Sequence, residues 1–156
     1  MEANITRQNI TPFLWLDGKV EEAVNFYTSV FKNSKIINTR RFGDKVMTAT
    51  FRLNGVEFMA LDGGPLYKFT EAISFFVKCS TQEEVDTLWE KLSKGGEKSR
   101  CGWLKDKYGV SWQIIPDALG ELMGDPDPAK AGRVMQAMLK MEKIDIKGLQ
   151  QAYNGQ

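Results

Sequence analysis

The sequence predicts an α+β protein in which one strand–helix–three-strand module (βαβββ) occurs twice and is followed by C-terminal helices. Three observations support this prediction. The same order of strand-like and helix-like segments runs from residue 8 to 64 and again from 70 to 116. The pair Asn54-Gly55 joins two strand-like runs, a strong hairpin signal because both turn residues need positive φ. Residues of matching type also recur in the two copies at constant offsets, which indicates a duplication.

The first copy begins with an apolar and aromatic run at residues 10–16, which predicts a strand that ends at Asp17-Gly18. A helix is predicted over residues 20–31, because apolar side chains recur there with the 3, 4, 7 spacing of one helical face. Three stretches rich in β-branched and aromatic residues complete the copy as predicted strands. They are residues 36–42, 46–53 and 56–61.

The second copy repeats this order with a strand predicted at residues 73–77. Ser80 or Thr81 is expected to cap a helix, with a glutamate three residues on completing a capping box. Gly95-Gly96 ends that helix. Shorter strands are predicted after it, at residues 98–101, 103–107 and 110–115.

The two copies superimpose at two offsets. At an offset of 62 residues, Phe13 falls on Phe75, and at an offset of 54 residues, Met59 falls on Gln113. The change of offset implies shorter strands or turns in the second copy. Met59 and Gln113 are therefore the equivalent positions on the last strand of each module.

Beyond Pro116 the pattern becomes helical. Asp127 followed by Pro128 predicts the start of one helix, and Asp145 is expected to cap another. Each helix has an apolar face that must pack on this domain or on a partner subunit. We therefore expect a single two-module domain at residues 8–116, with modules at 8–64 and 70–116, and a C-terminal helical extension at 117–156.

Composition excludes several classes of function. The sequence contains no histidine, which excludes an imidazole base, histidine metal ligands and Ser-His or Cys-His pairs within one chain. The 21 basic and 20 acidic residues give a net charge of +1, so no nucleic-acid partner is expected. No apolar run is long enough to span a membrane and the N-terminus lacks signal-peptide organisation, so we expect a cytoplasmic protein. Cys79 and Cys101 are expected to be free thiols.

Three motifs resemble the PhnB-like branch of the vicinal oxygen chelate superfamily, which includes glyoxalase I, bleomycin-resistance proteins and extradiol dioxygenases. They are PFLWLDG at residues 12–18, EEAVNFY at 21–27 and GWLKDKYGVSWQ at 102–113. The resemblance covers about residues 8–116. It implies the glyoxalase/bleomycin resistance fold, an eight-stranded, partly open, barrel-like sheet in which each module forms half of a cleft.

Members of this branch are often labelled 3-demethylubiquinone-9 3-methyltransferase-like, a label that implies a methyl donor. The sequence contains no glycine-rich strand-to-helix loop such as donor-binding Rossmann folds use, so we do not expect methyl transfer. Metal enzymes of the superfamily hold ligands on the first and last strands of each module. The resemblance places the last-strand ligands at Met59 and Gln113, and the first-strand positions near Ala72 and residues 10–12. A thioether, an amide and alkyl groups bind divalent cations poorly, so we predict no metal ligand and no cofactor.

Strand parity selects candidate ligand-binding residues. Trp112 and Ile114 are apolar and should face the helices, which turns Ser111, Gln113 and Ile115 into the cleft. Gln113 is either a polar anchor for a ligand or a buried glutamine satisfied by a neighbour. Glu57 would share the cleft face with Met59, either as a general base or as a solvated strand-end residue.

On the first strands, Leu14, Ser74 and Phe76 should line the cleft if both strands have the same parity. Phe13, Trp15 and Phe75 would then pack between sheet and helices. Trp103, in a loop-rich stretch, is expected to cover the cleft mouth. No catalytic residue is recognisable, and whether the protein is an enzyme stays open.

Three hypotheses for function follow. The first is a metal-independent protein that sequesters an apolar or aromatic small molecule in the cleft, with Gln113 as polar anchor, and that forms a homodimer. The second is a metal-dependent lyase, isomerase or dioxygenase of the same superfamily, with an atypical ligand set such as Glu57 and Gln113. The third is an interaction module in which the methionine-rich tail docks on a partner.

Overall fold

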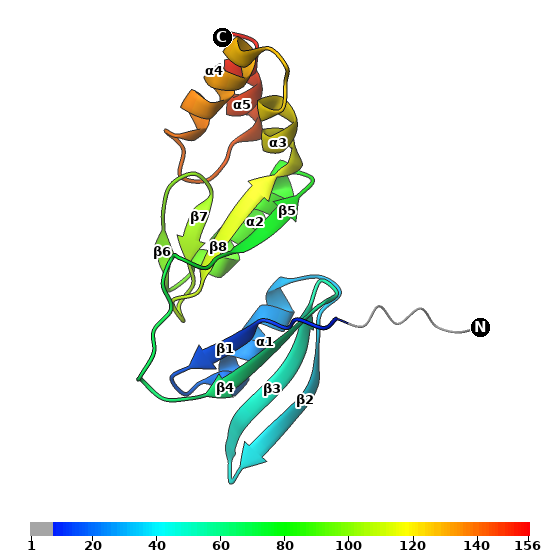
Figure 1. The fold of residues 1–156 in the computed structure, drawn as a ribbon, viewed down its shortest axis with the longest axis vertical. Coiled ribbons are helices and arrows are strands. Elements are labelled where there is room, and N and C mark those ends of the chain that lie inside the picture. The colour runs from blue at the N-terminus through cyan, green and yellow to red at the C-terminus, as the bar shows by residue number, and fades with distance from the viewer. Residues whose placement is uncertain (1–7) are drawn as a thin grey trace, which may run out of the picture. The chain divides into compact units, whose positions relative to one another are not determined.

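The computed structural model describes residues 8–156, and contacts divide the chain into two units with the boundary after Lys68 (Figure 1). The first unit contains β1 (Phe13–Leu16), α1 (Val20–Val30), β2 (Lys35–Phe42), β3 (Lys45–Leu53) and β4 (Val56–Asp62). The second contains β5 (Phe75–Cys79), α2 (Gln82–Ser93), β6 (Glu97–Lys98), β7 (Trp103–Lys105) and β8 (Ser111–Pro116). Three helices follow in that unit: α3 (Asp117–Met123), α4 (Pro128–Met138) and α5 (Ile146–Tyr153).

Each unit has one four-stranded sheet, and the two sheets share a topology. Their strand orders are β1-β4-β3-β2 and β5-β8-β7-β6. The first and last strands of each module are parallel neighbours, and the other pairs are antiparallel. The predicted βαβββ duplication is therefore confirmed. The strands form two four-stranded sheets that are not closed into one barrel.

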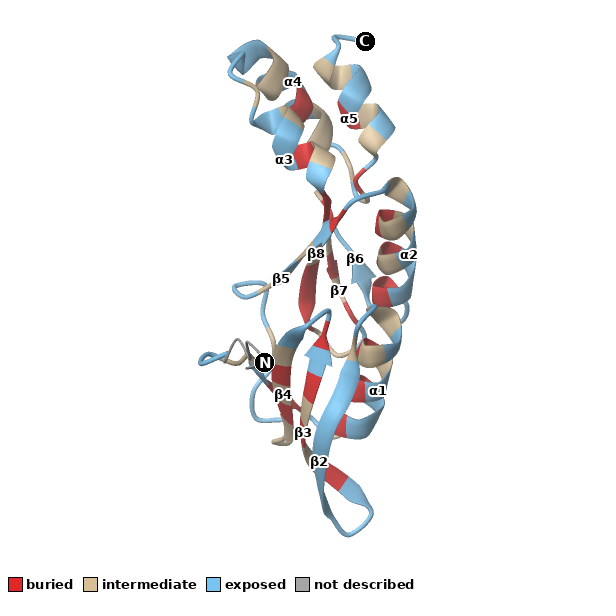
Figure 2. Cartoon of the chain, turned by 90° about the vertical axis from the view of Figure 1, so that its right-hand side faces the viewer, coloured by how far each residue is buried: buried red, intermediate tan, exposed pale blue. Residues whose placement is uncertain are grey.

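In the first unit, α1 covers one face of the sheet (Figure 1). Tyr27 on α1 is fully buried and stacks on Phe51 of β3, with ring centroids 6.4 Å apart. Phe51 in turn stacks on Phe58 of β4. The edge strand β2 is exposed along its whole length (Figure 2). Asn54 and Gly55 have φ values of 48° and 83°, as the predicted hairpin turn requires.

In the second unit, α2 has the predicted N-terminal cap. The side chain of Thr81 accepts a hydrogen bond from the Glu84 amide at 3.2 Å, and the Glu84 carboxylate accepts one from the Ser80 amide at 2.8 Å. These reciprocal bonds satisfy two amides that the helix itself leaves unpaired. β6 and β7 are only two and three residues long, which accounts for the shorter second copy. The first strand begins at Phe75, two residues later than predicted.

The Lys105-Asp106-Lys107-Tyr108-Gly109 turn explains part of the third sequence motif. The Asp106 carboxylate is 2% exposed and accepts hydrogen bonds from the amides of Tyr108 and Val110 and from the indole of Trp112. A buried carboxylate with several such donors fixes the backbone around it. These motif residues hold the β7–β8 connection in place.

The C-terminal extension packs within the second unit and contains three helices rather than the two that were predicted. The additional helix, α3, follows directly from β8. A separate apolar core joins the end of β8 to the extension. Its buried members are Ile115, Leu119, Val134, Ile144 and Leu149. The apolar faces of the tail helices therefore dock on their own chain.

No helix in residues 8–156 is long and apolar enough to cross a membrane.

Candidate functional site

The strand register corrects the superposition of the two copies. Phe13 lies opposite Met59 in the first unit, whereas Phe76 lies opposite Gln113 in the second. Since Met59 and Gln113 are equivalent, Phe13 corresponds to Phe76, and the offset on the first strands is 63 rather than 62. A slip of one residue transfers every side chain to the other face of a strand.

The prediction that Leu14 lines the cleft is therefore wrong. Leu14 is 5% exposed and pairs with Ala60 on the face of the sheet covered by α1. Phe13 and Trp15 lie on the opposite, open face, although they were expected under the helix. Phe13 is 48% exposed. The Trp15 ring lies directly over Gly63, and its indole donates a hydrogen bond to the Gly64 carbonyl at 2.9 Å.

In the second unit, the predicted parity agrees with the structure. Trp112 and Ile114 are buried, and Phe75 contacts Trp112 at a ring-centroid distance of 5.2 Å. Phe76 and Gln113 therefore lie on the open face. Ile115 was also expected there; it packs in the apolar core of the extension and also lines the pocket over this sheet.

Three predicted site residues form one row across the open face of this sheet. Phe76 on β5 and Trp103 on β7 are the direct register partners of Gln113 on β8, one on each side. We call these three residues the aromatic row. The Gln113 amide donates a hydrogen bond to the Ser74 hydroxyl at 2.9 Å, so a fourth predicted residue supports the row. The corresponding row in the first unit is Phe13, Met59 and Thr50.

A pocket of about 710 Å³ lies over this row, within the second unit. The sheet contributes its floor, which includes the whole aromatic row and Cys101. The tail contributes Leu119, Gly120 and Met123 from α3 and Met138 from α4. Lys78, Asp117 and Glu121 supply its charged groups. The pocket is thus mainly apolar, with one central amide, which is a common composition for small-molecule sites.

The remaining predicted residues do not line this pocket. Ser111 is 2% exposed, and its hydroxyl has no hydrogen-bond partner among residues 8–156. Met59 and Glu57 are half-buried on β4 of the first unit. The Glu57 carboxylate lies 4.0 Å from the Arg52 guanidinium, and the Glu57 backbone makes two hydrogen bonds to the Gln8 side chain.

The donor atoms at the family's metal-ligand positions do not fit a divalent cation. Gln113 offers a neutral amide already bonded to Ser74, and Met59 offers a thioether. Divalent metals in such proteins need several imidazole, carboxylate or thiolate donors. No group of three or more His, Cys, Asp or Glu side chains in the described part of the chain could hold a metal ion.

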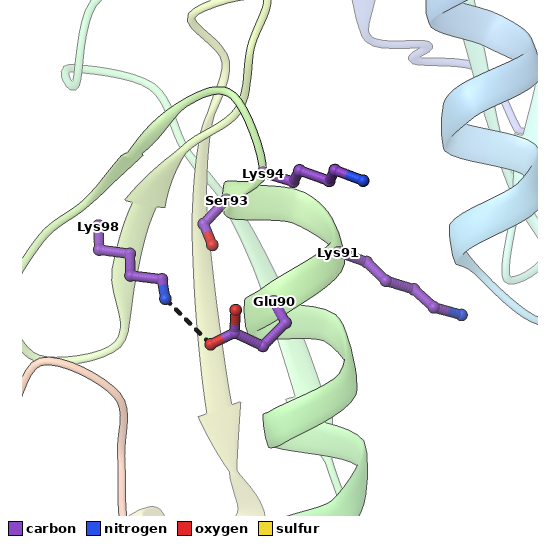
Figure 3. A pocket seen from close by; sticks show the side chains of 5 residues that line it. All are labelled: Glu90, Lys91, Ser93, Lys94 and Lys98. Atoms are coloured by element: carbon purple, nitrogen blue, oxygen red, sulfur yellow. Dashed lines mark hydrogen bonds and ion pairs between the residues drawn. The ribbon is translucent and has the colours of Figure 1, made fainter.

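A second hollow, of about 420 Å³, lies at the C-terminal end of α2 (Figure 3). Lys98 and Glu90 form an ion pair at 3.0 Å there, while Lys91 and Lys94 extend away from it. Exposed lysines around a shallow hollow form no convergent set of groups. The pocket over the aromatic row is the better candidate site because an amide and two aromatic side chains line it together.

The two cysteines differ in environment. Cys79 is 1% exposed, and burial together with nearby Glu84 and Asp117 raises the pKa of its thiol to about 11. Cys101 is half-buried at the pocket, with its sulfur 3.7 Å from the Met138 carbonyl. The sequence did not lead us to expect Cys101, Met138 or α3 as parts of the site. The apolar spacing of Leu119, Leu122 and Met123 was the available signal for α3.

Comparisons with known proteins agree with this fold. The family model described as 3-demethylubiquinone-9 3-methyltransferase matches residues 8–115. A Bacillus cereus structure, named for that methyltransferase and as a PhnB protein, is 43% identical, and the match covers 70% of this chain and 99% of that one, with a TM-score of 0.66.

Two more distant structures share the fold. A Pseudomonas aeruginosa protein is 20% identical, with a TM-score of 0.60 and coverage of 70% of this chain and 98% of that one. The fosfomycin resistance protein FosX of Listeria monocytogenes, complexed with Mn(II) and sulfate, is 16% identical, with a TM-score of 0.52 and coverage of 68% and 89%. No curated protein matches the sequence.

Proposed function

This chain belongs to the family described as 3-demethylubiquinone-9 3-methyltransferase, whose glyoxalase-type fold supports a small-molecule-binding role, and from this premise we propose that it sequesters an apolar or aromatic molecule without a metal. The aromatic row beneath the 710 Å³ pocket carries the proposal. In this proposal the molecule is held rather than converted, because the row itself consists of two aromatic rings and an amide, none of which is an acid, a base or a nucleophile.

The spacing of the row favours a planar ring. Adjacent strands lie about 4.8 Å apart, so the backbones that carry Phe76 and Trp103 are separated by roughly 10 Å. Side chains that rise from these positions leave room for one flat ring between them, since aromatic contacts form at centroid distances of about 4.5–7 Å. Such a ring would lie over Gln113.

Gln113 would orient the bound molecule. One polar end of its amide is held by Ser74 at 2.9 Å, which fixes the side chain and leaves the other end for a ligand. A hydroxyl on the ligand's edge would donate a hydrogen bond to this free end, the amide oxygen. A neutral hydrogen bond of this kind contributes about 0.5–1.5 kcal/mol, which selects an orientation while the apolar walls supply most of the affinity.

Methyl transfer has little support at this site. Each sheet contains a single parallel strand pair, whereas donor-binding Rossmann folds use a largely parallel sheet and a glycine-rich strand-to-helix loop. The metal-dependent alternative would need more anionic donors than Gln113, Ser74 and Met59 supply. We therefore propose that the molecule is bound without a methyl donor and without a metal ion.

Titration of 15N-labelled protein with 2-naphthol tests the proposal, because this molecule is flat and apolar and has one hydroxyl. The side-chain amide signal of Gln113 and the indole signal of Trp103 should shift together and saturate, also in the presence of excess chelator. The indole signal of Trp89, which lies on α2, is 2% exposed and does not line the pocket, should not move. The 2-naphthol recovered afterwards should be chemically unchanged.

Substitution of Gln113 distinguishes a specific hydrogen bond to its amide from nonspecific apolar binding. Gln113→Leu should weaken 2-naphthol binding about fivefold to tenfold, the value of one neutral hydrogen bond. Gln136→Leu is a matched control on the exposed side of α4 and should bind like the native protein. Equal affinity in all three proteins, or binding that chelator abolishes, would count against the proposal.

A further inference from the structure

The C-terminal extension builds half of the candidate pocket, although the family match ends at residue 115. Leu119, Gly120 and Met123 of α3 and Met138 of α4 line the pocket together with residues of the sheet. Without these helices, the aromatic row would be an open sheet face rather than one side of a cleft.

Several contacts fix the extension as a wall. The amides of Cys101 and Gly102, next to the row, donate to the carbonyls of Met141 and Glu142, each at 2.8 Å. Gly102 permits close packing on both sides, because a Cβ there would lie 2.7 Å from the Ile115 side chain of β8 and 3.2 Å from the Ile144 side chain of the extension.

A second attachment joins the extension to α2. The Gln82 side chain bonds both the Ile144 carbonyl, at 3.0 Å, and the Ile146 amide, at 2.8 Å. Lys143 pairs with Asp86 at 2.8 Å. Together with the apolar core around Val134 and Leu149, these bonds hold α3 and α4 in one position. A wall fixed before binding lowers the entropic cost of ordering a site.

We propose that this extension is the specificity element of the site: α3 and α4 set the size and shape of the aromatic molecule that the aromatic row accepts. The inference rests on the proposed function, which supplies the ligand class. Met123 and Met138 form the adaptable part of the wall, since unbranched thioether side chains adjust to irregular shapes. Gly120 leaves the central part of α3 without a side chain, so the ligand has room there.

Gly120 offers a test that does not depend on weakening the fold. A Cβ at Gly120 would meet nothing within 4 Å, and the residue lies inside α3. Gly120→Phe therefore adds bulk to the pocket without a backbone clash, and it replaces a poor helix former with a better one. Gly132 in α4 is a matched control, because its surroundings are equally open and it does not line the pocket.

The experiment measures 2-naphthol affinity and melting temperature for the native chain, Gly120→Phe, Gly132→Phe and Gln113→Leu. We expect Gly120→Phe to lose at least about tenfold in affinity with an unchanged or higher melting temperature, and Gly132→Phe to bind like the native chain. If Gly120→Phe binds 2-naphthol with native affinity while Gln113→Leu binds it more weakly, the inference about the extension is overturned and the proposed function stands.

Two further outcomes would also count against the inference or against the proposed function. Equal losses in Gly120→Phe and Gly132→Phe would overturn the inference, since the loss would then have no connection to the pocket wall. No shift of the Gln113 and Trp103 signals in the native chain would overturn the proposed function, and the inference with it.

Discussion

Gln113 has a different role from that of the residues around it in the sequence. Trp112 is buried and bonded to Asp106, and Ile114 is fully buried, so both are structural. Gln113 lies between them on the open face, and its side-chain amide donates a hydrogen bond to the Ser74 hydroxyl. Alternation along one strand thus separates a buried structural face from the open face at which we propose that the ligand binds.

The two cysteines provide a prediction at this scale. Iodoacetamide reacts with thiolates, and a pKa raised to about 11 keeps Cys79 protonated at pH 8. Burial also blocks the reagent. Cys101 is half-buried at the pocket, so it should be modified first, as peptide mass spectrometry of the native protein would show. Urea-unfolded protein, in which both should react alike, is the control. Faster modification of Cys79 in the native protein would contradict this account.

At the scale of elements, the sequence was informative where a local rule decides the structure. The Asn54-Gly55 turn, the cap at Thr81 and the order of the strands follow from turn and capping preferences, and the structure confirms them. The face of β1 was mispredicted because PFLWL is apolar at every position. Such a run carries no alternation, and only the pairing of Phe13 with Met59 reveals which side chains face outward.

The pocket could be predicted only in part, for a related reason. Its floor follows from strand parity, which placed Phe76 and Gln113 correctly. Its wall depends on long-range docking of the extension through Gln82 and Lys143. No local pattern encodes that contact, so the contribution of Met138 could not be read from its helix alone.

Docking of the extension should depend on pH in both directions. The Lys143 ammonium and the Gln82 amide lower the pKa of Asp86, and the Tyr153 hydroxyl lowers that of Asp125. These carboxylates stabilise the folded tail above their ordinary pKa of 3.8, and the contribution is lost as pH falls through the lowered values. The Asp125 carboxylate raises the pKa of Tyr153 above 10.0, so that contribution is present below pH 10.0 and lost above it.

Methyl NMR signals of Ile144 and Leu149 in the tail core would follow this docking. They should stay constant between roughly pH 5 and 9 and change on both sides. Asp86→Asn should reduce the acid change, and Tyr153→Phe should remove the alkaline change. An alkaline transition that persists unaltered in Tyr153→Phe would show that another group controls it.

For the whole molecule, the homodimer stays a prediction. The first unit exposes several large apolar side chains, among them Ile10 at 88%, Phe42 at 82% and Phe13 at 48%. Apolar groups gathered on a surface often mark a contact with another chain. Sedimentation equilibrium should therefore detect a dimer, and Phe42→Ser should weaken it if the β2–β3 hairpin takes part. A monomer at all accessible concentrations would contradict the prediction.

The central claim is that the second unit holds a flat aromatic molecule over Gln113 without a metal. A crystal structure of the complete chain with 2-naphthol, grown with chelator present, tests it most directly. The account predicts the naphthol ring between Phe76 and Trp103, against α3, with its oxygen about 3 Å from the Gln113 amide. An empty pocket, or a naphthol bound elsewhere on the protein, would contradict it.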